Sequence, residues 1–598
     1  MLDSVPVPLQ AVFWPLLGAA IILAANRLLP QWLGCLIASA AAVASFAVLW
    51  SLRNLETTRL EFTWEPLGLF RTSPALYPDG LALFGGLALT TITAALVLGI
   101  RSPGAHKATR HGLLLVVLAG GLITTMGTNL PTLAIGSALI DLALITMAVT
   151  RESPGSRSDG PILGMIATGA LSTLILAFSG FHLSAQVGTT SLLAPDLPAE
   201  VFLMVAVAGM LRLRIYPLHP RRTNTAMDAA TALLLTGVGI QLIARSQAIE
   251  PILEGQPWTL ALGSVALLAG GLLAWAAVPS LKLRVSEPVD SLPAPPETAG
   301  ERGETIPHHW LGILVNQAGV ALVFLYLLGP AVPWPLLSLT LALGILVIWS
   351  DASPKGNVGP HPRWFEQAAQ QVQAGWVQVR SRLAERIPAL EHWEGSRFHG
   401  KSAILLPAIA LASLAGLPLT VGAIARWSLY GAVLKDGHGT LLLALLVADT
   451  FLAAALGIAL VATWPQIQER RPRALSLVAM LALAFVMFVA GIAPGGLYES
   501  LGLDPIRPSG VSIWGLGLVY VLPWALSIPL ARARTHLTGY LPLVWKIVNL
   551  DWFYRAASWL GRRVSGAVYW LGLVGEGDGW LGWALIIMAL GAVLLAAR

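Results

Sequence analysis

The stretch Leu211-Arg-Leu-Arg-Ile-Tyr-Pro-Leu-His219 places two arginines, a proline and a histidine at the end of an apolar run that begins near Val201. A second stretch repeats this combination of helix breaker and cation: Ser413-Leu-Ala-Gly-Leu-Pro-Leu-Thr420, followed by Val421-Gly-Ala-Ile-Ala-Arg426. Charges at membrane depth are costly, so they indicate a functional role or a nearby partner. Helix breakers at that depth are tolerated where the chain is buried in protein or lines a wet cavity. Two such sites in one chain predict a membrane protein built from repeats, an architecture common among transporters.

The composition is that of a polytopic membrane protein. Of 598 residues, 56% are hydrophobic and 11% are charged, whereas a soluble protein has about 25% charged residues. The single cysteine, Cys35, lies in an apolar run, which excludes a disulfide framework and cysteine-based metal or haem motifs within the chain. The net charge of +6 is interpreted as loop charge on the cytoplasmic side, and no nucleic-acid partner is predicted.

The apolar runs predict an all-α protein with about sixteen transmembrane helices, since a span needs about 20 mostly apolar residues. The predicted spans lie near residues 10–29, 32–52, 81–100, 112–128, 131–150, 161–181, 198–217, 227–246, 257–279, 309–329, 332–350, 402–433, 440–464, 474–493, 512–531 and 577–597. The first run is interpreted as a span because it lacks the basic region and cleavage site of a signal peptide.

The distribution of Lys and Arg predicts the orientation of the chain in the lipid bilayer. These residues gather in the connections after odd-numbered spans, for example 101–110 and 470–473, whereas the connections at 128–131 and 329–335 carry no charge. The positive-inside rule places the basic connections in the cytoplasm. We therefore expect a multi-pass protein of a bacterial plasma (inner) membrane with both termini outside.

Three segments are predicted to lie outside the spans. Residues 285–307, rich in Pro, Glu and Gly, are typical of a flexible cytoplasmic insertion. Residues 361–396 and 541–574 combine aromatic and basic side chains, as expected of amphipathic helices at the cytoplasmic interface. These helices either cover the membrane surface or contact a specific partner.

Four stretches, in order along the chain, resemble the antiporter-like membrane subunits of respiratory complex I and of the Mrp-type cation/proton antiporters. Tyr77-Pro-Asp-Gly-Leu-Ala-Leu-Phe84 resembles the Asp-Gly-Leu-Ser stretch that opens the third span of this family. The stretch from Arg212 to His219 resembles its Lys-Ser-Ala-x-x-Pro-x-His stretch. The stretch from Ser413 to Arg426 resembles its Ser-Leu-x-Gly-x-Pro…Gly-x-x-x-(Lys/Glu) stretch. Leu550-Asp-Trp-Phe-Tyr-Arg555 resembles a C-terminal segment of antiporter-type members.

The resemblance implies two inverted repeats, each with a broken helix, and proton movement along buried ionisable side chains. It divides the chain into N-terminal spans (1–111), a first repeat (112–256), a second repeat (257–464) and C-terminal spans (465–598). Cytoplasmic insertions near 285–307 and 351–400 interrupt the second repeat. In this comparison Arg212 stands at the lysine of the seventh span, and Arg426 stands at the lysine or glutamate of the twelfth. The partners implied are other membrane subunits of a hetero-oligomeric complex.

The sequence departs from the family where the proton carriers are expected. The fifth-span acid is replaced by Gly136-Ser137-Ala138, and the nearest acid is Asp141, a helical turn later. The eighth span offers Thr236 in place of a lysine, and residues 337–349 of the eleventh span hold no ionisable group. Arginine stays charged under essentially all conditions. The candidates for titration are therefore His219, the three acids and water; the acids are Asp141, Asp228 and Asp449.

Asp141 and Arg212 form the expected pair, because opposite charge stabilises the ionised carboxylate and loss of that contact lets it protonate. Each candidate also has a structural interpretation. Arg212 lies near the end of its span and could extend its guanidinium to the membrane surface. His219 is either a relay or a structural cap. Arg426 and Asp449 are either part of the pathway or an ion pair that holds helices together.

Three functions fit these observations. The first is an antiporter-like subunit that translocates protons or sodium ions within an energy-converting membrane complex. The second is a scaffold subunit that no longer conducts. The third is a subunit for proton-coupled uptake of inorganic carbon, with a soluble partner at the cytoplasmic face. No nucleotide, metal or redox motif occurs in a credible context, so we predict no cofactor and no redox catalysis by this chain alone.

Overall fold

The computed structural model describes most of the chain. The described residues are 6–25, 31–53, 60–61, 75–100, 107–150, 160–194, 197–214, 216, 218, 226–249, 257–277, 309–329, 334–351, 395–469, 474–501, 512–534, 536–537, 539–550, 552–553, 556, 559 and 563. They fall into two compact units, Met1–Thr538 and Gly539–Arg598, and the candidate site lies within the first.

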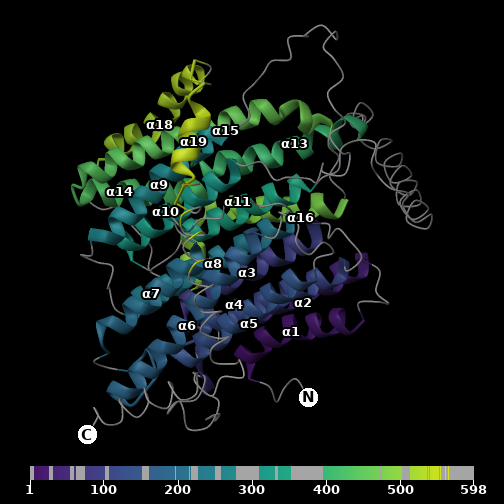
Figure 1. The fold of residues 1–598 in the computed structure, drawn as a ribbon. Helices are drawn as coiled ribbons and strands as arrows, with labels where there is room; N and C mark the ends of the chain where they lie inside the picture. Colours follow the sequence, from purple (N-terminus) through teal and green to yellow (C-terminus); the bar gives the residue numbers. More distant parts are fainter. Residues whose placement is uncertain are drawn as a thin grey trace. The chain divides into compact units, whose positions relative to one another are not determined.

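Helices dominate the described part of the chain (Figure 1). Their bounds are α1 Val7–Ala24, α2 Gln31–Leu52, α3 Gly80–Gly99, α4 Lys107–Met126, α5 Leu130–Val149, α6 Gly160–Val187, α7 Ala199–Leu213, α8 Ala226–Ile249, α9 Pro257–Ala277, α10 His309–Leu328, α11 Trp334–Ser350, α13 Gly395–Leu414, α14 Val421–Lys435, α15 Gly439–Glu469, α16 Ala474–Ile492, α17 Pro494–Ser500, α18 Ile513–Ala533 and α19 Leu541–Val548. A two-residue strand, β1 (Leu60–Glu61), pairs antiparallel with β2 (Ala75–Leu76) just before α3.

The helices coincide with the predicted spans from 10–29 to 512–531, so the all-α polytopic fold is confirmed. Among the described residues, 11 helices are long and apolar enough to cross a membrane, and α10 and α11 are shorter apolar helices. The count of about sixteen stays a prediction. The last predicted span and the segments 285–307 and 361–396 lie outside the described residues, and α19 represents the start of the predicted 541–574 helix.

The predicted break in the span 402–433 is confirmed, because this range is divided between α13 and α14. The connection turns at Gly416, whose φ of +90° suits glycine, and at Leu419, whose φ is +68°. In the first half, α7 ends at Leu213, earlier than the predicted 217, because Arg214 adopts the left-handed conformation. The repeat boundaries themselves stay predictions.

Close backbone contacts bring α9 and α10 together. A Cβ on Gly319 would lie 2.8 Å from the carbonyl oxygen of Gly263, and one on Gly312 would lie 2.8 Å from that of Gly270. Small residues at such crossings allow helices to approach closely in a membrane, where van der Waals packing drives association. In the first half of the chain, α4, α5, α6 and α7 pack in sequence order (Figure 1).

Candidate functional site

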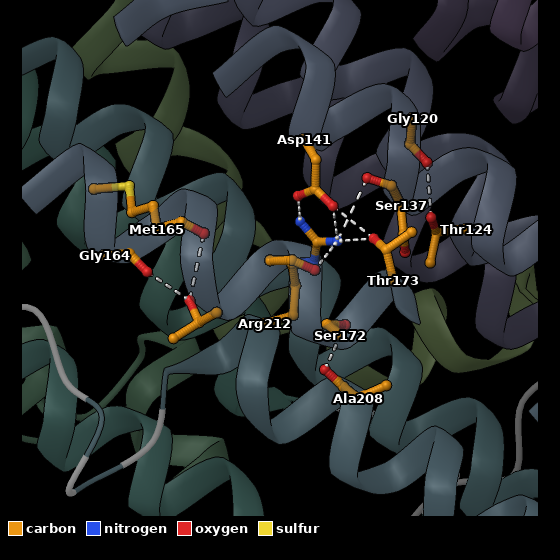
Figure 2. A network of polar contacts seen from close by, with 12 residues as sticks. Gly120, Thr124, Ser137, Asp141, Gly164, Met165, Ser172, Thr173, Ala208 and Arg212 are labelled. Atoms are coloured by element: carbon orange, nitrogen blue, oxygen red, sulfur yellow. Dashed lines mark hydrogen bonds and ion pairs between the residues drawn. The ribbon is translucent and has the colours of Figure 1, made fainter. Parts of the chain in front are cut away.

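A buried ion pair joins α5 and α7. The Nη1 of Arg212 lies 2.5 Å from Oδ1 of Asp141, and its Nη2 lies 3.3 Å from Oδ2 (Figure 2). Both residues are buried, with Arg212 only 2% exposed. The guanidinium therefore points into the helix bundle toward Asp141, and the predicted pair is present. The alternative in which Arg212 reaches the membrane surface is wrong.

Helix α6 completes the surroundings of this pair. Nη2 of Arg212 donates to Oγ1 of Thr173 at 3.0 Å and to the carbonyl oxygen of Gly169 at 3.3 Å. It also lies 3.4 Å from the carbonyl oxygen of Ser137 on α5. The hydroxyl of Thr173 donates to Oδ2 of Asp141 at 2.6 Å. The planar fork of arginine suits such a set of fixed acceptors, which a single ammonium group would contact less completely.

Gly169 makes this arrangement sterically possible. A Cβ at this position would overlap Oδ1 of Asp141 and lie 2.9 Å from Nη1 of Arg212. The ion pair thus lies directly against the backbone of α6. Sequence reasoning missed both Gly169 and Thr173, because neither carries a charge and the facing helix is not evident from the sequence.

A second buried ion pair joins α14 and α15. Nη1 of Arg426 lies 2.5 Å from Oδ1 of Asp449, and the hydroxyl of Tyr430 donates to Oδ2 of Asp449 at 2.7 Å. Nη2 of Arg426 donates to Oδ1 of Asn316 on α10 at 3.3 Å. The pairing that the sequence suggested for Arg426 and Asp449 is therefore present. Whether this pair also carries protons stays a prediction.

Helix α18 packs against the break between α13 and α14, beside this second pair. The hydroxyl of Tyr520 donates to the carbonyl oxygen of Gly416, and its ring packs edge-on against Trp427. This contact satisfies a carbonyl that the break leaves without a helical partner. The C-terminal spans thus contribute directly to the surroundings of Arg426.

A third ion pair, between Asp79 and Arg245, escaped sequence analysis. Nη2 of Arg245 also donates to the carbonyl oxygen of Thr125 at 2.7 Å, while Oδ1 of Asp79 caps α3 by accepting from the N–H of Ala82 at 2.8 Å. Arg245 lies in the last part of an apolar helix, and that position was the available signal. The pair ties α8 to the start of α3 and the end of α4.

Two further site residues were predicted, Asp228 and His219. Asp228 is buried in the first turn of α8 and makes polar interactions there. His219 lies outside the described residues. The hydroxyl of Thr236 donates to the carbonyl oxygen of Ala232 at 2.8 Å, an ordinary bond within α8. In the part of the chain that the structure describes, no group of three His, Cys, Asp or Glu could hold a metal ion.

Sequence comparison finds no matching family model and no matching curated protein. Solved structures, in contrast, include clear matches in fold. A chain of the Mrp complex from Dietzia sp. DQ12-45-1b has 16% sequence identity and a TM-score of 0.63, with 99% of the present chain and 63% of that chain covered. A chain of respiratory complex I from Thermus thermophilus has 16% identity and a TM-score of 0.57, with coverage of 82% and 99%.

A third similar chain belongs to the membrane-bound sulfane sulfur reductase, an archaeal respiratory membrane complex. It has 14% identity and a TM-score of 0.64, with coverage of 98% of the present chain and 99% of that chain. The protein is therefore a multi-pass membrane protein with the fold of antiporter-like membrane subunits, as the sequence resemblance implied. The present chain spans 63% of the Mrp chain that it matches. Identities this low establish the fold, whereas function depends on the site.

Proposed function

We propose that this chain is an antiporter-like subunit of a multisubunit membrane complex and translocates protons through its buried ion pairs. The observation that carries this proposal is the pair of Asp141 and Arg212, which is buried where α5, α6 and α7 meet. A buried charge pair is weak evidence for stability, because desolvation offsets much of the attraction. Ionisable groups inside a membrane are more often explained by an ion pathway.

The chemistry of the pair assigns the titrating role to Asp141. Arginine does not release its proton in proteins, so Arg212 provides a fixed positive charge. This charge favours the ionised carboxylate of Asp141, and a movement that weakens their contact favours proton uptake. Asp449 and Arg426 provide the same combination in the second half of the chain. Protons are the ions that such carboxylates exchange most directly, and sodium ions are the second candidate.

A scaffold subunit is the second candidate function. It is favoured by the arginines at both central positions and by α11, which is buried and whose residues 334–350 include no ionisable side chain. In this case the ion pairs connect helices and hold the subunit in shape for its neighbours. Other membrane subunits are the proposed partners in both cases. A soluble partner at the cytoplasmic face would instead support uptake of inorganic carbon.

The experiment is proton transport by the native complex in reconstituted vesicles with Asp141→Asn. The substitution removes the titrating group while keeping its shape, so we expect transport per assembled complex to be abolished. Undiminished transport would contradict the proposal. A scaffold predicts a different result, in which Asp141→Asn and Arg212→Leu reduce the amount of assembled complex and leave transport per complex unchanged. The subunit composition of the purified complex separates redox partners from a soluble carbon-binding partner.

A further inference from the structure

Many helical threonines among the described residues make the same hydrogen bond. Their hydroxyls donate to the carbonyl oxygen four residues earlier in the same helix, a common arrangement for a helical threonine. The threonines that do so are Thr90, Thr93, Thr124, Thr146, Thr168, Thr231, Thr236, Thr340 and Thr450. This bond gives the hydroxyl an acceptor within its own helix.

The hydroxyl of Thr173 makes a different hydrogen bond. Its hydroxyl donates across the helix interface to Oδ2 of Asp141 at 2.6 Å and accepts from Nη2 of Arg212 at 3.0 Å (Figure 2). The carbonyl oxygen four residues earlier belongs to Gly169, and it accepts from Arg212 at 3.3 Å. The hydroxyl of Thr173 therefore has two candidate acceptors. One is the carboxylate of Asp141, and the other is the carbonyl oxygen of Gly169 in its own helix.

The choice between these acceptors depends on the charge of Asp141. An ionised carboxylate only accepts hydrogen bonds, whereas a protonated carboxyl group also donates one. When Asp141 takes up a proton on Oδ2, the hydroxyl of Thr173 can accept from it and donate to Gly169 instead. A rotation of the hydroxyl about the Cβ–Oγ1 bond makes this exchange, and the hydroxyl of Thr173 and the carboxyl group of Asp141 then still have partners.

The same arrangement occurs around Asp449. One carboxylate oxygen contacts Arg426, and the other accepts from the hydroxyl of Tyr430 at 2.7 Å. In both halves, a carboxylate thus lies between a guanidinium that cannot titrate and a hydroxyl that can donate or accept. Arg212 from α7 and Thr173 from α6 bond to Asp141, and the carbonyl oxygens of Gly169 and Ser137 accept from Arg212. Arg426 and Tyr430 from α14 contact Asp449. Asn316 from α10 and Tyr520 from α18 lie beside Arg426.

We infer that Thr173 is a positioning residue of the proton site, whose hydroxyl stabilises ionised Asp141 and changes its partner to Gly169 when Asp141 is protonated. The inference rests on the proposed function in that it takes Asp141 as the titrating group. It adds that the affinity for the proton is set by a residue without charge. Removing the hydroxyl removes a hydrogen bond from both forms of Asp141, but the bond to the ionised carboxylate is charge-assisted and therefore the stronger of the two. Protonation should then occur at higher pH.

The test is an infrared pH titration of the purified full-length protein, with proton transport by the native complex measured in parallel. Subtraction of the Asp141→Asn spectrum identifies the band of the protonated Asp141 carboxyl. Thr173→Val removes the hydroxyl with little change in shape, and Thr173→Ser restores it. Ser172→Ala is the matched control, because Ser172 is the adjacent hydroxyl and donates to the carbonyl oxygen of Ala208 on α7 at 2.8 Å.

For Thr173→Val we expect the titration midpoint of the Asp141 band to rise by about one pH unit, a tenfold change in proton affinity. Thr173→Ser and Ser172→Ala should stay close to the parent midpoint. An unchanged midpoint in Thr173→Val, an equal shift in Ser172→Ala, or the absence of an Asp141 band at every pH would overturn the inference. If the infrared shift appears while no variant or parent complex transports protons, the role of Thr173 stands and the proposed function fails.

Discussion

At the scale of single residues, the first ion pair depends on shape as much as on charge. Asp141 and Arg212 attract each other, but their position is fixed by uncharged neighbours on α6, namely Gly169 and Thr173. Removing one partner of a buried pair typically costs about 3–5 kcal/mol, because the remaining charge has no compensation. The uncharged neighbours therefore decide whether the pair can form with a small free-energy penalty for burying its charges.

Gly169→Ala should destabilise the protein by about 1–3 kcal/mol, since the new methyl group overlaps the carboxylate of Asp141 and forces the pair or α6 to move. Thermal unfolding of the detergent-solubilised protein measures the effect as a lower midpoint temperature. Gly457→Ala on α15 is the control, because a Cβ there meets nothing within 4 Å. It should be neutral or slightly stabilising, as alanine is favoured over glycine in helices. Equal stability of the two variants would show that the pair does not lie against α6.

At the scale of elements, the break between α13 and α14 explains how Arg426 comes to lie beside Asp449. A continuous helix would satisfy the carbonyl of Gly416 internally, whereas the break exposes it to the hydroxyl of Tyr520 from α18. The break also begins α14 at Val421, so that Arg426 falls in its second turn and its side chain is buried. Broken helices of this kind are typical of ion and substrate sites within membranes.

Gly416→Ala should destabilise this region by about 1–3 kcal/mol, because alanine is strained at a φ of +90°. The added Cβ would also lie 3.3 Å from both Cγ of Arg426 and the hydroxyl of Tyr520. Gly437→Ala separates the two causes, since its φ is +71° and a Cβ there meets nothing within 4 Å. Thermal unfolding of both variants should show the larger loss for Gly416→Ala. A loss of the same size in both would mean that contacts at the break contribute nothing.

At the scale of the whole molecule, the loop charges predict an orientation that the arrangement of helices does not determine. The turn between α14 and α15 follows an even-numbered predicted span and should lie outside, whereas the residues after α18 should lie in the cytoplasm. The two regions offer accessible positions at Asp436 and His536, both of which are exposed.

Labelling of cysteines introduced at these two positions in intact cells tests the orientation. Asp436→Cys should react with a membrane-impermeant maleimide added outside, and His536→Cys should react only after the membrane is opened. The native Cys35 is buried, so the parent protein provides the blank. The reverse pattern of labelling would place both termini in the cytoplasm and would require the basic connections to lie outside.

The sequence by itself determined the helices, the position of the break and the buried charges that require a partner. Lengths of apolar residues predicted the helices, Pro418 and its neighbours predicted the break, and buried charges such as Arg212 required partners. These properties are local, because burial of a backbone in lipid demands helices and a charge there demands compensation. The similarity of the fold to known membrane subunits followed from the same local patterns.

The tertiary structure alone decided the contacts beyond the two predicted ion pairs. Asp79 and Arg245 are 166 residues apart, and the sequence around one of them does not predict contact with the other. Thr173 contacts Asp141 in preference to its own helix because α6 packs against α5 with Gly169 at the crossing. A sequence shows that a helix has a polar face, whereas packing selects the neighbour that this face meets. For this reason the charged members of the site were predicted and its uncharged members were found only in the structure.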